Sequence, residues 1–395
     1  MTATEPPPGT HTVWDDLVGQ HRAAESLRRA ADGQGMSHAW LFTGPPGSGR
    51  SNAAIAFAAA LQCERDDQRG CGVCHECRTV LKGSHADVIL VRTEKLSIGI
   101  AEARDLVRRA ALAPVGRRRQ IIIVEDADRL TEGACNALLK AIEEPTARTV
   151  WMLCAPTIED VLPTIRSRSR LVTLTTPTAR AVADFLVRTD GVDAERASYA
   201  ARASQGHIGR ARALARDDDV RDRRDSVVAV PATLTSLGAC MRAATALAET
   251  TKAEADAITS ALDTRERQDL AESYGVVERG RRPREYGPAA ALLERNQKTR
   301  AKRRHLDVVD RALMDLVSVY RDAVAIAAGA PGELVNEERR AEITGLAESS
   351  SAELNLRRIG WIFDAREQML EFNVPVPLAL ESMMVALKLP EGARR

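Results

Sequence analysis

The chain has 395 residues, of which 44% are hydrophobic and 28% charged, and its formal net charge is +1. This length exceeds what one hydrophobic core usually supports, so we expect a globular protein with more than one domain. No run approaches the roughly 20 apolar residues that span a bilayer, and a near-zero net charge gives no overall field to hold DNA, which argues against a membrane protein and a free-standing DNA-binding protein.

Residues 1–12 are expected to form a disordered tail. They include three consecutive prolines, and they contain neither the basic segment nor the apolar segment of a secretion signal. We therefore expect a cytoplasmic protein.

Five short apolar runs in the first half of the chain predict β-strands. Helix-like segments separate these runs, and such alternation favours a buried parallel sheet. One of the intervening segments, 133–144, has an apolar helical face and ends before Pro145. The predicted strands are 39–43, 87–91, 120–124, 150–154 and 170–174.

A glycine-rich loop follows the first predicted strand and opens an alanine-rich helix. Its residues, 44–51 (GPPGSGRS), have the pattern of a phosphate-binding Walker A loop, in which backbone N–H groups approach phosphate oxygens. The pattern departs from the motif at one position, because Arg50 stands where the motif has lysine, and a planar guanidinium differs from an ammonium in reach and donor geometry. The candidate nucleotide-binding residues here are Gly44, Gly47, Gly49, Arg50 and Ser51.

Glu125 and Asp126 end the third predicted strand, where a Walker B motif would place its acids. Their order, Glu before Asp, reverses the usual one and moves each carboxylate by about a methylene, and catalytic geometry is sensitive to shifts of about 1 Å. Three alternatives stay open at this point: a working ATPase, a loop that holds ATP and Mg²⁺ without turnover, and an inherited scaffold. Ser51 keeps nucleotide binding open, since its hydroxyl could bind Mg²⁺.

Four cysteines lie close together in a loop rich in Asp, Arg and Gly. Cys63, Cys71, Cys74 and Cys77 have the spacing Cys-x7-Cys-x2-Cys-x2-Cys, and two-residue spacers let thiolates meet one tetrahedral Zn²⁺. Four sulfurs leave no position for water, so this pattern predicts a structural zinc site. An iron–sulfur centre or free thiols are the alternatives.

The second half of the chain is predicted to be helical. An apolar stripe in 306–324 requires a partner helix. Within this half, 263–304 is crowded with Arg and Glu and lacks a sustained apolar face, so we interpret it as a solvated or partly disordered insertion instead of a basic patch that contacts DNA.

Several motifs occur in the order found in bacterial clamp-loader subunits. They are 14–20 (WDDLVGQ), 37–44 (SHAWLFTG), the four-cysteine insertion, 136–145 (NALLKAIEEP) and 165–168 (IRSR). Residues 12–215 thus resemble this AAA+ family strongly, and 373–382 (NVPVPLALES) resembles the close of its collar domain. The departures at Arg50 and in the Glu125–Asp126 order resemble the delta-prime branch of the family, whose loops are commonly degenerate.

The resemblance implies an α/β AAA+-type parallel sheet with flanking helices, a small helical lid and an all-α collar. The implied domains are a P-loop domain over 13–176 with a zinc-binding insertion at 63–77, a lid over 177–222, and an oligomerising collar over 223–395 that contains the charged insertion 263–304.

The resemblance also implies a function within DNA polymerase III. A delta-prime subunit joins the clamp loader as a stator, beside tau/gamma motor subunits and delta, while the complex places a sliding clamp on primer-template DNA. In the family, the arginine at the position of Arg168 is a finger that neutralises charge on the γ-phosphate in the neighbouring motor subunit, so catalysis would occur in trans. We do not expect this chain to have ATPase activity of its own or a polymerase active site. The alternative is an ATP-hydrolysing tau/gamma-type motor subunit.

Overall fold

The computed structural model describes residues 11–93, 97–116, 118–276, 283–330 and 332–388. The chain divides into two compact units, of which the first ends at Ala215 and the second begins at Arg216. Residues 1–10 of the expected tail lie outside the described residues. The finer domain boundaries expected at 176 and 222 stay predictions.

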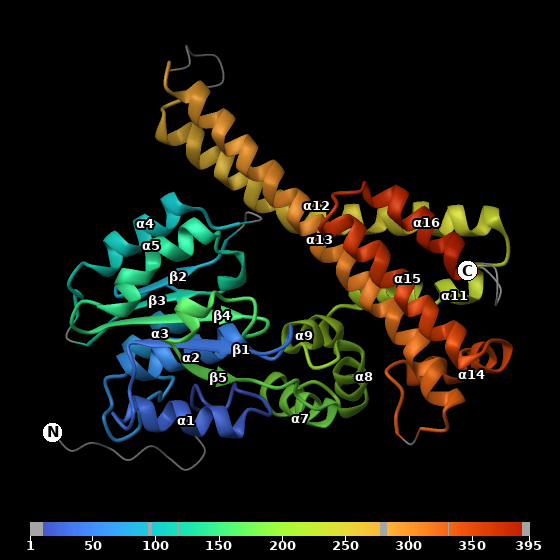
Figure 1. Ribbon diagram of the computed structural model, residues 1–395, viewed down its shortest axis with the longest axis horizontal. Helices are drawn as coiled ribbons and strands as arrows, with labels where there is room; N and C mark the ends of the chain where they lie inside the picture. Colours follow the sequence, from blue (N-terminus) through green and yellow to red (C-terminus); the bar gives the residue numbers. More distant parts are fainter. Residues whose placement is uncertain (1–10, 94–96, 117, 277–282, 331, 389–395) are drawn as a thin grey trace. The chain divides into compact units, whose positions relative to one another are not determined.

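The N-terminal unit alternates strands and helices and then becomes helical (Figure 1). Its strands are β1 (Ala39–Thr43), β2 (Val88–Val91), β3 (Gln120–Val124), β4 (Thr149–Ala155) and β5 (Arg170–Thr173). Its helices are α1 (His21–Ala31), α2 (Arg50–Gln62), α3 (His75–Leu81), α4 (Ile100–Ala110), η1 (Ala127–Arg129), α5 (Glu132–Glu143), α6 (Pro163–Arg166), α7 (Ala179–Asp190), α8 (Ala194–Ser204) and α9 (Ile208–Arg216).

The five strands form one parallel sheet in the order β2-β3-β4-β1-β5. All five coincide with the apolar runs expected from the sequence. The inner strands β1, β3 and β4 are buried along their whole length because helices cover both faces of the sheet, whereas most of the edge strand β5 is exposed. Since parallel strands end at one edge, the residues that follow β1, β3 and β4 come together there. The expected α/β fold, a parallel sheet with flanking helices, is confirmed.

Alternation along β1 distributes its side chains between two cores. Trp40 and Phe42 pack with α1, α2 and α3 on one face, whereas Ala39 and Leu41 pack with α4 and α5 on the other. The α2 helix is apolar nearly all round, which suits a helix buried against the sheet. Because β1 is anchored in both cores and α2 in one of them, the ends of the loop between β1 and α2 are held in place.

The C-terminal unit is helical throughout the residues that the structure describes. Among the described residues, none of the helices combines the length and the apolar character needed to cross a membrane. Its helices are α10 (Asp218–Val228), α11 (Val230–Thr233), α12 (Leu237–Ser273), α13 (Tyr286–Ala327), η2 (Glu337–Arg339), α14 (Arg340–Ser349), α15 (Ala352–Leu370) and α16 (Val376–Lys388).

The apolar stripe expected in 306–324 lies in α13 and forms the centre of this unit's core. Val309, Leu313, Leu316 and Tyr320 are buried there against α12, α15 and α16. The partner helices that the stripe requires are therefore present within the same unit.

Most of the charged segment 263–304 continues the facing ends of α12 and α13, which pair as a helical hairpin (Figure 1). Arg300 is buried between the helices and donates to Asp263 and Glu266, and the Gln297 side chain donates to the Asp263 carbonyl at 3.0 Å. Residues 277–282 lie outside the described part. Ion pairs between helices replace the missing apolar face.

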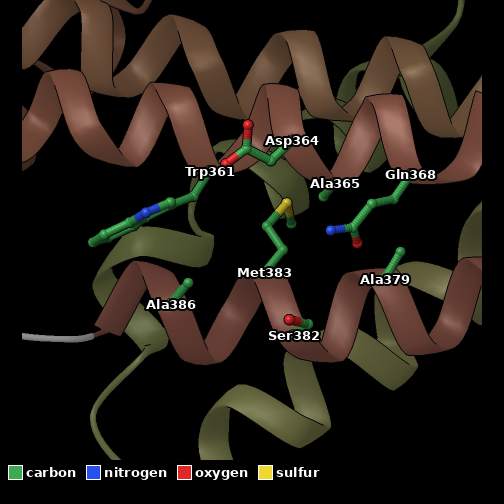
Figure 2. A pocket seen from close by; sticks show the side chains of 8 residues that line it. All are labelled: Trp361, Asp364, Ala365, Gln368, Ala379, Ser382, Met383 and Ala386. Carbon is green, nitrogen blue, oxygen red and sulfur yellow. The ribbon is translucent and has the colours of Figure 1, made fainter. Parts of the chain in front are cut away.

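A small pocket lies between α15 and α16, with Met383 at its centre and Trp361 at one end (Figure 2). Its volume is about 60 Å³. Ligand pockets usually have about 300–1,000 Å³, so this one is too small for a nucleotide.

Candidate nucleotide loop, arginine finger and metal centre

The candidate phosphate loop connects β1 to α2 at the carboxyl edge of the sheet. Gly47 and Gly49 have φ angles of 87° and 88°, in the left-handed region that favours glycine. At Gly47 there is also no room for a side chain, because a Cβ atom would lie 2.7 Å from the Cα atom of His207. The segment between α8 and α9 thus packs directly on the loop.

Arg50 is the first residue of α2, and its side chain turns back onto the loop. Its Nη1 donates a hydrogen bond to the Gly44 carbonyl. Burial lowers the pKa of this guanidinium, although Asp128 and Asp126 nearby oppose the effect. The cation therefore interacts with the loop's own backbone, where a Walker lysine would reach toward phosphate.

Gln20 ties the loop to the end of β5, a role that the sequence did not reveal. Its buried side-chain amide donates to the carbonyls of Ser48 and Thr175 at 3.2 and 2.6 Å, and the Thr175 amide donates back at 3.2 Å. The Ser48 hydroxyl is buried without a partner among the described residues. An unpaired buried hydroxyl in such a loop is available to a phosphate oxygen, so the loop retains part of what nucleotide binding needs.

Glu125 and Asp126 follow β3 and lie at the same edge as the loop, since β4 pairs with both β1 and β3. Arg92 donates from Nε to one Glu125 oxygen at 2.9 Å, while the other oxygen is buried without a partner among the described residues. A carboxylate already engaged by arginine is a poorer ligand for Mg²⁺. The structure therefore places the nucleotide-site candidates at one edge of the sheet. Two of them already contact an arginine of the chain, Gly44 through Arg50 and Glu125 through Arg92.

Arg168 lies on the surface just after α6. Its Nε is 2.5 Å from Oε1 of Glu143, and the two side chains are 39% and 40% exposed. Its Nη1 donates to the Thr164 carbonyl at 2.8 Å and to the Ser167 hydroxyl at 3.1 Å. The guanidinium is thus accessible but held in one orientation.

The four cysteines predicted to bind zinc converge in the structure. Their sulfur atoms all lie within 4.8 Å of one another, and Cys63 is 3.6 Å from Cys71 and 3.9 Å from Cys74. Sulfurs about 2.3 Å from one tetrahedral ion would be about 3.8 Å apart. The Cys74 and Cys77 amides donate to the sulfurs of Cys71 and Cys74 at 3.4 Å, which favours thiolates. These residues fit a zinc ion.

The cysteine loop packs on the N-terminal segment. The Trp14 indole donates to the Arg69 carbonyl at 2.9 Å, and the Val13 amide donates to the Gly70 carbonyl at 3.0 Å. Gly70 has a φ of 85° and no space for a Cβ atom, which would lie 2.7 Å from Val13. This contact could not be predicted from local sequence patterns, because the partners are more than fifty residues apart.

A family model described as "DNA polymerase III, delta subunit" matches residues 19–178. The gamma/tau subunit of Mycobacterium tuberculosis is 33% identical over 47% of this chain and 33% of its own length. The delta' subunit of Bacillus subtilis is 29% identical over 53% of this chain and 63% of its own length, and that of Pseudomonas aeruginosa is 32% identical over 46% and 52%.

The matched region thus covers from 33% to 63% of the length of these relatives. A gamma subunit-related protein of Thermotoga maritima aligns with 74% of this chain and 98% of its own, at 17% identity and a TM-score of 0.37. Residues 19–178 are therefore similar to DNA polymerase III clamp-loader subunits of the delta-prime and gamma/tau type.

Proposed function

We propose that the chain is a delta-prime-type stator of the clamp loader. It joins a complex with tau/gamma-type motor subunits and a delta subunit, and that complex loads a sliding clamp on primer-template DNA. Arg168 serves as the finger that reaches the nucleotide of the neighbouring motor subunit. A role at chromosomal DNA also implies a cytoplasmic location.

The side chain of Arg50 carries this proposal. It donates to the Gly44 carbonyl inside the candidate phosphate loop, so it does not take the part of the Walker lysine. The contact between Arg92 and Glu125 supports the same conclusion at the metal side of the site. We infer that the chain's own loop does not hydrolyse ATP, and that its catalytic contribution is made in trans.

A motor subunit of the same complex is the second candidate. Gamma/tau subunits are among the relatives at 32–33% identity, as similar as the delta' subunits. The unpaired Ser48 hydroxyl would also suit a loop that holds phosphate. The contacts of Arg50 and Arg92 argue against ATP turnover, and for this reason we place the motor subunit second.

ATP binding and hydrolysis by the purified chain test the proposal directly. We expect no steady turnover by the unmodified chain, with or without nucleotide binding. The Arg50→Lys variant, measured alongside, tests whether the missing Walker lysine is the only defect of the site. Because Arg92 contacts Glu125, we expect this variant to show no turnover either. Steady hydrolysis by the unmodified chain would put the motor subunit first.

A further inference from the structure

Glu143 is the last residue of α5, and its carboxylate is the anionic partner of Arg168. The two residues are 25 positions apart in the sequence, and α6 lies between them. Their contact joins Nε of the guanidinium to Oε1 at 2.5 Å. The motif that suggested a finger contains Arg168, and nothing in the motif names the residue that holds it.

The donors of Arg168 are divided between two sides. Nε faces Glu143, and Nη1 faces the Thr164 carbonyl and the Ser167 hydroxyl. Nη2 has no hydrogen-bond or ion-pair partner within the described part of the chain, so its two N–H groups remain for an outside anion. A guanidinium held at Nε and Nη1 still presents Nη2 to a phosphate oxygen.

We propose that Glu143 is the positioning residue of Arg168, holding the guanidinium so that Nη2 is presented to the nucleotide of a neighbouring subunit. This inference rests on the proposed function, since it assumes that Arg168 acts in trans. Arginine has many rotamers, and a finger that is already oriented loses less conformational freedom when it meets the phosphate. The contribution of Glu143 is therefore preorganisation, and Glu143 itself touches no substrate.

The size of the effect follows from the exposure of the pair. Ion pairs between side chains as exposed as these contribute little, so removing the carboxylate should change the population of the presenting rotamer by about two- to five-fold. The same weakness lets the guanidinium adjust when the phosphate arrives. The effect belongs in kcat, because the finger acts on charge at the γ-phosphate in the transition state.

The test uses the assembled complex, with only the motor subunit next to this chain retaining a competent nucleotide site. Steady-state kcat and KM for ATP are measured with Arg168→Ala, Glu143→Ala, Glu143→Gln and both alanines together. We expect Arg168→Ala to remove most of the turnover and Glu143→Ala to lower kcat about two- to five-fold with little change in KM. Glu143→Gln keeps an acceptor oxygen and should lose less.

Glu144→Ala is the matched control, because this neighbouring glutamate is exposed and forms no ion pair among the described residues. It should leave kcat unchanged. With Arg168 already replaced, Glu143→Ala should have no further effect, whereas a merely structural role would lower turnover and complex assembly in both backgrounds.

The outcomes separate the two proposals. If Arg168→Ala leaves turnover unchanged in a complex that assembles normally, the finger assignment itself fails. If Arg168→Ala lowers turnover while Glu143→Ala matches the unmodified chain, only the positioning role is overturned. A rise in kcat with Glu143→Ala would also overturn it, since Glu143 would then hold the finger away from the phosphate.

Discussion

Arg224 is a buried charged residue in the core of the C-terminal unit. Its side chain is 3% exposed, and its Nε lies 3.3 Å from a carboxylate oxygen of Asp315, which is 4% exposed. Nη2 donates to the Asn336 side chain at 2.5 Å, and Asn336 in turn donates to Ser318 and Asp322 at 2.9 and 2.8 Å. This buried network joins α10 and α13 to the segment before η2.

Replacing Arg224 by alanine should destabilise the C-terminal unit strongly. The change leaves the Asp315 carboxylate buried without the positive charge of Arg224, and breaking a buried pair in this way typically costs about 3–5 kcal/mol. Denaturant unfolding followed by circular dichroism measures the loss as a lower midpoint at constant slope.

Arg223→Ala provides the comparison at the next position. Its guanidinium lies 3.3 Å from Glu254 and is 35% exposed, so its removal should cost less than about 1 kcal/mol. Equal midpoints for the two variants would mean that the Arg224 network contributes no more than a surface pair.

At the level of elements, the loop that carries the four cysteines (63–77) holds the segment around Val13 and Trp14 in place through hydrogen bonds. Because the Arg69 and Gly70 carbonyls that hold Trp14 and Val13 lie inside that loop, the metal and the segment should be ordered together. Chelation, or Cys74→Ser, should release about one zinc per chain and expose the Trp14 indole. Metal analysis and tryptophan emission measure the two effects, the second as the difference between the chain and Trp14→Phe.

Cys135→Ser is the control for this prediction, because Cys135 is buried in the same unit but lies outside the cluster. It should retain the metal and the Trp14 signal. A native preparation without metal would remove the zinc assignment, and release of zinc with unchanged Trp14 emission would remove the bracing role alone.

The elements differ in how far the sequence predicts them. The five strands and α5 could be predicted because their apolar runs end at glycine, proline or polar residues, and the cysteine cluster could be predicted because its ligands are close in sequence. The interpretation of 263–304 as a solvated or partly disordered insertion missed the helical hairpin, since the partners of Arg300 lie on the other helix and create no apolar period. Gln20, His207 and Glu143 were missed because their contacts join residues far apart along the chain.

For the whole molecule, the described cores of the two units are separate. The clusters on the two faces of the sheet lie in the N-terminal unit, and those around α13 lie in the C-terminal unit. A unit with its own core can unfold on its own, so the chain need not behave as a single cooperative system.

We therefore expect two thermal transitions in calorimetry of the full chain. Cys74→Ser should lower only the transition of the N-terminal unit, because the cysteine cluster packs in the core that contains Trp14 and α2. Arg224→Ala should lower only the other transition, since Asp315 and Asn336, with which Arg224 interacts, lie in the C-terminal unit. If one transition moved with both variants, the two cores would be coupled strongly enough to unfold together, and replacing a cysteine of the N-terminal unit would also destabilise the C-terminal unit.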